Sequence, residues 1–448
     1  DRMTTGHHHA AGSFEAAREG VRALVGAAVL QKLFVAFLFL LTLTMLPVGR
    51  SGPNDGGGLL APLTADSGSR DLFRLRPAVD FFCVYDAGAR ALAGRDPFGV
   101  NKDTGKPGFR APYVATFRYL PITAYWLGIP LNILPPWPAF HAWCVVNLLM
   151  LVANFLLCVG RNPKQLLLFA VIWFAWFPTI AELHMGQFSL LLGTLLLWGM
   201  DALCAGRSWG GVAWIFAVLL KLFPLAMAPS LFLWGRRKLV VAAILLCVVG
   251  SVPWFFFPSA VREGLVNRGA GGRIISEARQ PYAGAQGTQE LVNAVVWKAS
   301  GQSFLDEEVS AGTPAFMVPV INGAVLLVYA IICAWALWST RSKPNIHAIA
   351  LFWMAWFVAY RDCWEHHYMF MQALLGFMLA WRALEWRTIL LAWCFAGAPS
   401  LWWLWQRTGY AGSALPEMIG LLYFAQRPIA VGIIALDCIR MLRKKRGP

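Results

Sequence analysis

The residues best suited to chemistry begin in a polar stretch that precedes most of the apolar segments. Asp80 falls in the first turn of an expected helix, because Pro77 suits a helix start and Gly94 suits a helix end. The positive end of the helix dipole favours an ionised carboxylate there. Such a carboxylate can act as a general base, although a helix-start role alone would also explain it. Asp86 has Arg90 four residues on, so an ion pair competes with a binding role for it.

A second set of polar residues lies within or beside apolar runs, where an ionisable group is a functional candidate by default. The set consists of Arg118, Tyr119, Glu182, His184, Gln187 and Lys221. Simpler explanations stay open for three of them. Lys221 could snorkel to the membrane surface, and Glu182 and His184 could bond to each other.

The sequence 361–368 is a dense polar island between two apolar runs, and it contains His366 and His367. These histidines and nearby carboxylates suggest a metal site as one interpretation. Adjacent residues point to different faces of a helix, however, so they make poor joint ligands. Contact with a phosphate or a sugar hydroxyl is the better functional interpretation. A separate polar loop carries Arg279 and Gln289, which could bind phosphate or simply face solvent.

Together these residues would place one carboxylate, several cations and aromatic rings just above a lipid phase. Glycoside hydrolysis would usually need two paired carboxylates. Transfer from a sugar phosphate needs only a base, because cations can stabilise the phosphate as it leaves. The residue types therefore favour a lipid-linked sugar phosphate, presented at the membrane surface, as the substrate.

The composition indicates where these residues are displayed. The chain has 448 residues, of which 58% are hydrophobic and 14% are charged, whereas soluble domains carry roughly 25% charged residues. This excludes a cytosolic enzyme, a secreted disulfide scaffold and a disordered protein. Continuous apolar runs also argue against a β-barrel, whose strands alternate. We therefore expect an all-α membrane protein with many membrane-spanning helices.

The formal net charge is +15, and the basic residues gather between apolar runs, for example at 236–238, 341–343 and 440–446. This distribution is typical of the positive-inside rule, so membrane lipid is an expected partner and nucleic acid is not. Cys83 and Cys363 would both lie outside, where a disulfide between them is an open alternative to two free thiols.

About twelve apolar runs could span a membrane. They lie near residues 27–48, 115–134, 138–158, 165–182, 187–204, 209–233, 239–257, 316–339, 346–361, 367–384, 387–405 and 414–438. We expect a cytoplasmic tail at 1–26, one membrane domain at 27–438 with outer loops at 49–114 and 258–315, and a basic cytoplasmic tail at 439–448. Twelve spans put most basic clusters inside, but they place Arg161 and Lys164 outside. Either that region contains a re-entrant segment or the positive-inside rule fails there.

An ordered set of motifs across residues 30–410 resembles glycosyltransferase family 87, within the GT-C superfamily of multi-pass glycosyltransferases. The motifs are the stretch from Asp80 through Tyr85, Ala87 and Leu92 to Gly94, Asp96 and Pro97, then Tyr119 with Pro121, Gly186-Gln187, Lys221 with Pro224, Gly287-Thr288-Gln289, and Trp364-Glu365-His366-His367. The first and last are the most specific. Two departures bear on the donor sugar: Thr288 stands where Asn is usual, and Arg361-Asp362-Cys363 replaces a Ser-Pro-containing segment.

The resemblance implies a GT-C fold with a catalytic Asp in the first outer loop, a position that Asp80 matches. Asp80 would be the general base on the acceptor hydroxyl, and a β-linked polyprenyl-phosphate hexose such as mannose would become an α-glycoside. The acceptor would be a glycan, a glycolipid or a protein. No metal or other cofactor would be required. The candidate substrate-binding residues are Asp86, Arg118, Tyr119, Gln187, Lys221, Arg279, Gln289, His366 and His367.

The same resemblance implies a bacterial inner or plasma membrane, with the active site facing the periplasm or the outside. Two other functions stay open: a transporter or flippase of lipid-linked glycans, and a non-catalytic scaffold subunit that keeps the GT-C fold. The hydropathy pattern shows no internal repeat, which argues against a transporter.

Overall fold

A computed structural model gives the structure of the protein. It describes residues 29–43, 78–98, 117, 119–252, 285–304, 316–340, 344–360, 363–399, 401 and 414–444. Arg118, Arg279, most of the two expected outer loops, the expected N-terminal tail and residues 445–448 lie outside this part of the chain. Within it the regular elements are helices, and the one β-bridge pairs Ala285 with Trp364. The expected all-α architecture is confirmed.

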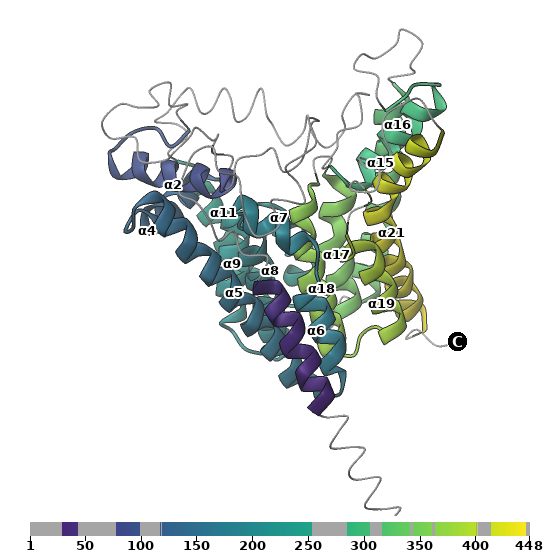
Figure 1. The fold of residues 1–448 in the computed structure, drawn as a ribbon, viewed down its shortest axis with the longest axis horizontal. Helices are drawn as coiled ribbons and strands as arrows, with labels where there is room; N and C mark the ends of the chain where they lie inside the picture. Colours follow the sequence, from purple (N-terminus) through teal and green to yellow (C-terminus); the bar gives the residue numbers. More distant parts are fainter. Residues whose placement is uncertain are drawn as a thin grey trace, which may run out of the picture.

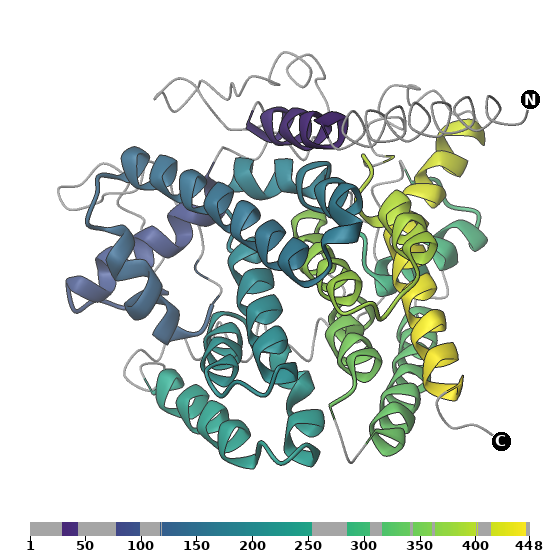
Figure 2. The same cartoon turned by 90° about the horizontal axis from the view of Figure 1, so that it is seen from below.

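The first half of the chain forms a helix at Val29–Leu43 and then a series of helices on one side of a wedge-shaped bundle (Figure 1). In chain order these are α2 (Val79–Leu92), α3 (Pro121–Thr123), η3 (Ala124–Gly128), α4 (Ile129–Leu131), α5 (Pro136–Arg161), η4 (Pro163–Gln165), α6 (Leu166–Phe174), α7 (Pro178–Met185), α8 (Ser189–Cys204), α9 (Gly210–Leu220), η5 (Phe223–Met227), α10 (Ala228–Leu233) and α11 (Arg237–Ser251). The helix Val29–Leu43 lies beside α6 (Figure 1 and Figure 2). The Thr42 hydroxyl donates to the Phe174 carbonyl (2.8 Å).

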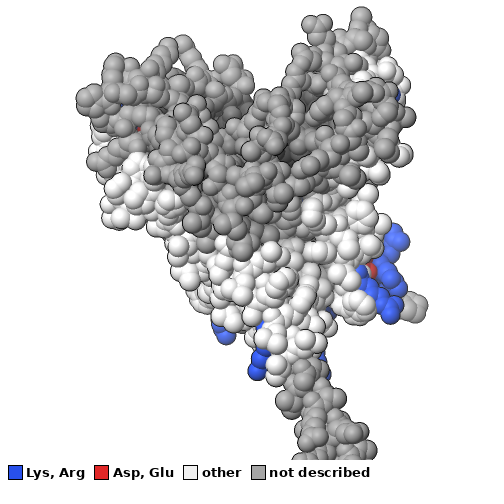
Figure 3. All heavy atoms as spheres, in the orientation of Figure 1, with Lys and Arg blue, Asp and Glu red and all other residues white. Residues whose placement is uncertain are grey.

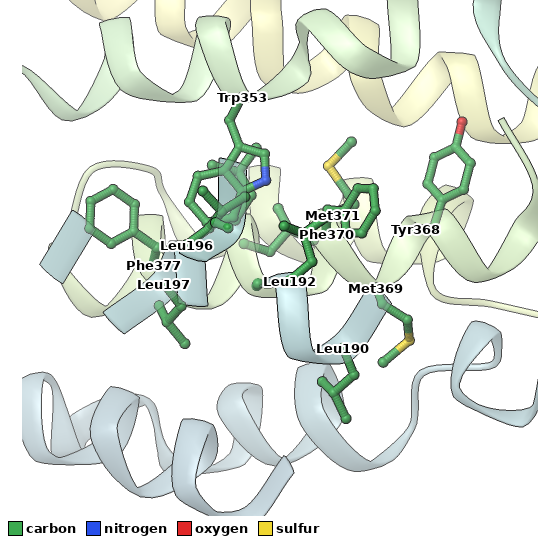
Figure 4. Packing of buried hydrophobic residues seen from close by; sticks show 14 of the residues in the cluster. Leu190, Leu192, Leu196, Leu197, Trp353, Tyr368, Met369, Phe370, Met371 and Phe377 are labelled. Carbon is green, nitrogen blue, oxygen red and sulfur yellow. The ribbon is translucent and has the colours of Figure 1, made fainter. Parts of the chain in front are cut away.

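The second half forms the other side of the wedge. Its helices are α15 (Thr288–Ala299), α16 (Met317–Ser339), α17 (Ile346–Ala359), η7 (Glu365–Tyr368), α18 (Met369–Ala380), α19 (Trp386–Ala396) and α21 (Ala414–Lys444). The two halves meet where α18 packs against α8 (Figure 4). All residues of α18 are buried, so this helix is the centre of the core. By contrast, α16 has many exposed apolar side chains, as expected of a surface in contact with lipid.

The expected count of about twelve spans is not confirmed. Among the described residues, three helices are long and apolar enough to cross a membrane, namely Pro136–Arg161, Met317–Ser339 and Met418–Lys444. A fourth would be the pair Pro163–Phe174 and Pro178–Met185, which is bent by 48°. Six further apolar helices have only 10–17 residues. Several hydrophobic runs are therefore divided into shorter helices, and Pro178 and Pro224 each stand at the start of one, where proline is well tolerated.

The run at 209–233 shows the consequence of such a break, because the chain turns back within it. α9 begins beside the end of α8, and a Cβ added to Gly210 would lie 2.4 Å from the Gly199 carbonyl oxygen. Its other end reaches the opposite side of the bundle, where Lys221 leaves the helix in an extended conformation. After this turn, Leu231 and Trp234 line the same small cavity as Cys204, near the point where α9 began.

This turn explains the distribution of positive charge. The segment 209–233 turns back to the end of the bundle where it began. Hydropathy therefore predicted one membrane crossing too many between Lys164 and Arg382. In the structure these two residues line one hollow, so the expectation that Arg161 and Lys164 face away from Arg382 is wrong. We call this end, which also holds Arg236, the basic end. Most Lys and Arg atoms visible in Figure 3 lie toward the tip of the wedge or beside the end of α21.

Candidate active site

The opposite end of the bundle, which we call the site end, contains most of the described residues predicted to act. Lys221 is half-buried there, and it follows the end of α9 in an extended conformation. Its Nζ atom lies 3.2 Å from Nε2 of His367. The same ammonium sits over the rings of Tyr119 (5.8 Å to the centroid) and Phe370 (5.7 Å). These contacts give a partly desolvated cation–π environment in place of the snorkelling role considered from the sequence.

His367 holds a defined tautomer opposite this lysine. Its Nδ1 accepts a hydrogen bond from the backbone N–H of Trp364 (3.0 Å). Burial and the Lys221 ammonium lower the pKa of His367 well below its usual range, so the ring is neutral near pH 7. A neutral ring with Nδ1 as acceptor carries its proton on Nε2. The Nε2–H group and the ammonium are then two donors facing each other, and an oxyanion bound between them would satisfy both.

Tyr119 and Gln187 form the adjoining wall. The Tyr119 hydroxyl donates to Oε1 of Gln187 (3.3 Å), and the Trp143 indole donates to the Gln187 carbonyl (3.1 Å). The preceding Gly186 has φ +62°, and a Cβ there would lie 2.6 Å from the Cβ of Phe81. Only glycine fits this turn without displacing α2, so the Gly-Gln motif links the end of α7 to the helix that carries Asp80.

Asp80 occupies the first turn of α2, as the sequence predicts. The start of this helix is fixed by Ala78, whose N–H donates to the His184 carbonyl (2.7 Å) at the end of α7. The half-buried carboxylate of Asp80 lies within electrostatic range of Lys221. Asp86, six residues later, pairs with Arg90 at 2.8 Å, which confirms the expected ion pair. Its proposed part in substrate binding stays a prediction.

Glu182 was a functional candidate in the sequence, but it was not among the predicted substrate-binding residues. It is fully buried in α7, and Oε1 accepts a hydrogen bond from the backbone N–H of Leu190 (2.7 Å). Its Oε2 atom is buried and has no hydrogen-bond partner among the described residues. The carboxylate lies within electrostatic range of both Lys221 and Asp80. Glu182 is therefore a second carboxyl group at the site end, beside Asp80.

His366 and Gln289 lie beside the same island. The His366 ring is buried and stacks on Trp364 with centroids 6.3 Å apart, and neither of its nitrogens has a hydrogen-bond partner in the described structure. Gln289, in the first turn of α15, donates from Nε2 to the Ala359 carbonyl, whereas its buried Oε1 has no partner in the same part of the chain. Both residues therefore retain polar atoms that a ligand could satisfy.

Arg427 is a functional candidate that the sequence analysis missed. It is fully buried in α21, where Nε donates to Oε1 of Gln286 (3.2 Å) and Nη1 donates to the Phe395 (2.9 Å) and Ala396 carbonyls. Its guanidinium also lies 5.6 Å from the ring centroid of Tyr368. A charged residue inside a predicted span was the available signal.

Gln286 connects Arg427 to the histidine island. Its carbonyl accepts from the Tyr368 hydroxyl (2.8 Å), its N–H donates to the Cys363 carbonyl (2.8 Å), and its side chain donates to the Tyr423 carbonyl (3.3 Å). Each polar atom of Gln286 is thus engaged. Cys363 and Cys83 are both free thiols, so the alternative of a disulfide between them is not what the structure contains.

Two of the predicted binding residues, Arg118 and Arg279, lie outside the described residues, and the structure leaves their roles as predictions. Five others, Tyr119, Gln187, Lys221, His366 and His367, are brought together with Asp80 and the unexpected Glu182 by the contacts above. The carboxylate of Asp80 lies at the positive end of α2, and the Lys221 ammonium and the neutral His367 ring lie opposite it. The arrangement can remove a proton at one side and stabilise a departing oxyanion at the other.

Comparison with known proteins gives one family match. The sequence model of glycosyltransferase family 87 matches residues 117–360. This range contains Tyr119, Glu182, Gln187, Lys221 and Gln289, whereas Asp80, His366 and His367 lie outside it. No curated protein matches the chain. Because the matched range covers more than half of the chain and the fold is a helical membrane bundle, the chain belongs to glycosyltransferase family 87 and is a membrane glycosyltransferase.

Proposed function

We propose that the protein transfers a hexose, most simply mannose, from a polyprenyl-phosphate sugar to a glycan, glycolipid or protein acceptor. The observation that carries this proposal is the 3.2 Å approach of Lys221 Nζ to His367 Nε2 beside Tyr119, with Asp80 in electrostatic range. Two converging donors suit a phosphate oxygen, and family membership supports glycosyl transfer over the transporter and scaffold alternatives. Mannose rests on the family resemblance alone.

In the proposed reaction Asp80 accepts the proton of the acceptor hydroxyl. The acceptor oxygen forms a bond to the anomeric carbon of the donor while the bond from that carbon to the phosphate oxygen breaks. The electron pair leaves on polyprenyl phosphate, and the added charge is stabilised by the Lys221 ammonium and the His367 Nε2–H. Attack from the face opposite the phosphate inverts a β-linked donor to an α-glycoside. These cationic and neutral donors supply the stabilisation that a metal would otherwise give.

We also propose that the site end faces outward from a bacterial inner or plasma membrane. Arg161, Lys164, Arg236 and Arg382 lie at the other end, which the positive-inside rule assigns to the cytoplasm. Asp80 and the histidine island would then meet a lipid-linked donor at the outer membrane surface. Such a donor needs no nucleotide, because its phosphate is already the leaving group.

The test uses full-length protein in nanodiscs with radiolabelled polyprenyl-phosphate mannose, polyprenyl-phosphate glucose and nucleotide-linked mannose, with membrane lipid extract as acceptor. We expect label to move from a polyprenyl-phosphate sugar, whether or not a chelator is present. Asp80→Asn should lower the rate by about 10²- to 10⁴-fold, because the general base is lost. Asp437→Asn, which makes the same change near the C-terminal end of α21, is the matched control and should stay within a few-fold of the wild type.

Retained transfer by a folded Asp80→Asn protein would exclude Asp80 as the base. Transfer from the nucleotide-linked sugar alone would overturn the proposed donor class, and a rate lost on chelation would overturn the metal-independent reaction.

A further inference from the structure

The basic end contains a hollow that has no part in the proposed transfer. It lies between the turn that joins α5 to α6 and the turn that joins α18 to α19, and it has a volume of about 320 Å³. Its lining residues are Asn162, Lys164, Gln165, Leu379, Arg382, Leu384, Glu385 and Trp386. We call it the Lys164–Arg382 hollow. α18 separates it from the histidine island, and twelve helical residues correspond to about 18 Å.

The walls of the hollow are held by buried hydrogen bonds. Asn162, which is 4% exposed, donates from its side chain to the Leu379 carbonyl (3.0 Å) and so ties one turn to the other. Beside it, Arg161 forms a two-pronged ion pair with Asp201, with N···O distances of 2.9 and 2.7 Å. The two turns are therefore fixed relative to each other before any ligand binds.

Arg382 stands at an unusual backbone position on the rim. Its φ is +52°, in the left-handed region that residues other than glycine seldom adopt. The turn is closed behind it by Ala383, whose N–H donates to the Met378 carbonyl (2.8 Å) and whose carbonyl contacts Nε2 of His347 (2.8 Å). The left-handed conformation of Arg382 ends α18 and leaves this side chain on the lining of the hollow. Such a conformation is strained for a residue other than glycine.

Three charged side chains line the hollow without pairing with one another. Lys164, Arg382 and Glu385 make no ion pair with any described residue. By contrast, the neighbouring Arg161 pairs with Asp201 through Nε and Nη2. Two separated cations and one carboxylate present the charge complement of a group that carries one anion and one cation.

The surroundings are those of a membrane surface. Trp386 is 51% exposed on the rim, and the Arg387 guanidinium lies 5.5 Å from its ring centroid. Tryptophan and arginine side chains of this kind anchor proteins at the boundary between headgroups and acyl chains. Further along the two flanking helices, Leu167 on α6 and Leu390 and Leu391 on α19 are exposed. A molecule with its polar part in the hollow would lay its apolar part on these leucines.

We propose that the Lys164–Arg382 hollow binds the headgroup of an aminophospholipid. The phosphodiester lies between Lys164 and Arg382, the ammonium group faces Glu385, and the acyl chains run along the exposed leucines of α6 and α19. The volume is at the lower end of the range for small-molecule pockets, about 300–1,000 Å³, which suits a headgroup more than a whole lipid. A phospholipid with an uncharged headgroup alcohol would leave the Glu385 carboxylate beside the phosphate without a cation.

Native mass spectrometry of the full-length protein tests this directly. Delipidated protein is titrated with phosphatidylethanolamine and with phosphatidylglycerol of matched chains, and the number of retained lipids is counted. We expect the wild type to retain one phosphatidylethanolamine about tenfold more tightly than phosphatidylglycerol. The double variant Lys164→Ala/Arg382→Ala should lose this lipid, and Glu385→Gln should abolish the preference between the two. Arg443→Ala/Lys444→Ala, which removes two cations from the end of α21, is the matched control and should behave as the wild type.

Soluble phosphoethanolamine and inorganic phosphate distinguish a lipid site from a phosphate site. Neither should displace the lipid at millimolar concentration, because neither can contact the leucines. Displacement by inorganic phosphate would reassign the hollow to a free anion. Equal lipid retention by the wild type and the double variant would overturn the site. An unchanged preference in Glu385→Gln would overturn the role given to the carboxylate. Thermal unfolding curves identify any variant that has lost its fold, and single Lys164→Gln and Arg382→Gln variants then replace the double variant.

Discussion

The two ends of the bundle hold their ionisable groups in different ways. At the basic end, Asp201 accepts hydrogen bonds from Arg161 through both oxygens and from the Trp381 indole (3.0 Å). At the site end, Glu182 keeps one buried oxygen without a hydrogen-bond partner among the described residues, and Lys221 faces the donor nitrogen of His367. A buried polar group without a partner costs stability. The Asp201 cluster, in which both carboxylate oxygens are bonded, can serve stability alone. The Glu182 cluster has a polar atom without a partner among the described residues, so it suits a ligand.

The largest expected effect tests whether the charge at the site end serves catalysis. Lys221→Met should keep the fold, because the methionine stem can occupy the space between the Tyr119 and Phe370 rings. It should lower the rate of transfer by about 10²- to 10³-fold, because a charge that stabilises the leaving phosphate is lost. The initial rate with a saturating polyprenyl-phosphate sugar measures this effect.

Arg161→Met is the control for that loss, because it removes a cation of the other end. Its thermal stability should fall and its rate per folded molecule should stay near that of the wild type. A Lys221→Met protein with wild-type turnover would remove the reason for treating the two ends as different.

The second effect compares the same chemical change at the two ends. Asp201→Asn breaks a mostly buried ion pair and should lower the free energy of unfolding by about 2–4 kcal/mol, with little effect on turnover. Glu182→Gln replaces a fully buried carboxyl group and keeps an oxygen that can accept from the Leu190 N–H, so stability should stay the same or rise while turnover falls. Thermal unfolding in detergent and transfer assays measure both properties. The comparison fails if the two variants lose stability equally.

The ends also differ in how far the sequence could predict them. The Asp80 helix follows from Pro77 and Gly94, and the observed helix Val79–Leu92 lies between them. Local signals of this kind need no knowledge of distant contacts. The approach of Lys221 to His367 joins residues 146 positions apart, and it followed only from the family resemblance. Residue spacing alone could not have brought these two side chains together.

Hydropathy failed where the chain turns back. The run at 209–233 contains no charged residue except Lys221, so its hydropathy predicts one crossing. The extended conformation of Lys221 and the short helix that follows depend on the surrounding packing. Arg427 was missed for a related reason. Its partners come from Gln286 and from the end of α19, which the sequence does not place beside α21.

A smaller effect concerns residues that act on the site through others. Arg427→Lys keeps a positive charge but cannot contact Gln286 and the Phe395 carbonyl together. Because Gln286 bonds to Tyr368 and Cys363, the histidine island should lose its fixed position. We expect kcat to fall about tenfold with KM changed much less, as for a positioning residue.

Arg440→Lys on the exposed face of the same helix is the matched control and should leave both constants unchanged. An Arg427→Lys protein that loses stability but keeps its kcat would assign Arg427 to the fold alone, and it would place Arg427 with the Asp201 cluster in the comparison.

The smallest effect is a dependence of stability on pH to which the two histidines of the site end contribute. Burial and the Lys221 ammonium lower the pKa of His366 and His367 well below the usual value of 6.5. Below about pH 6.5 the unfolded chain therefore binds more protons than the native protein. The stability that these neutral rings contribute is present above that pH and is lost as the pH falls. Each histidine can contribute a slope of at most about 1.4 kcal/mol per pH unit.

His366→Gln should remove about half of this slope between pH 6.5 and 5.5, measured by thermal unfolding across a pH series. His141→Gln, at an exposed histidine of α5, should leave it unchanged. If the two variants respond alike, the slope does not come from buried rings. If only His366→Gln changes the slope, the His366 ring is neutral in the native protein. A neutral ring is also the condition under which His367 can donate from Nε2–H. Bound polyprenyl phosphate, whose negative charge opposes the Lys221 ammonium, should then raise both pKa values and flatten the slope further.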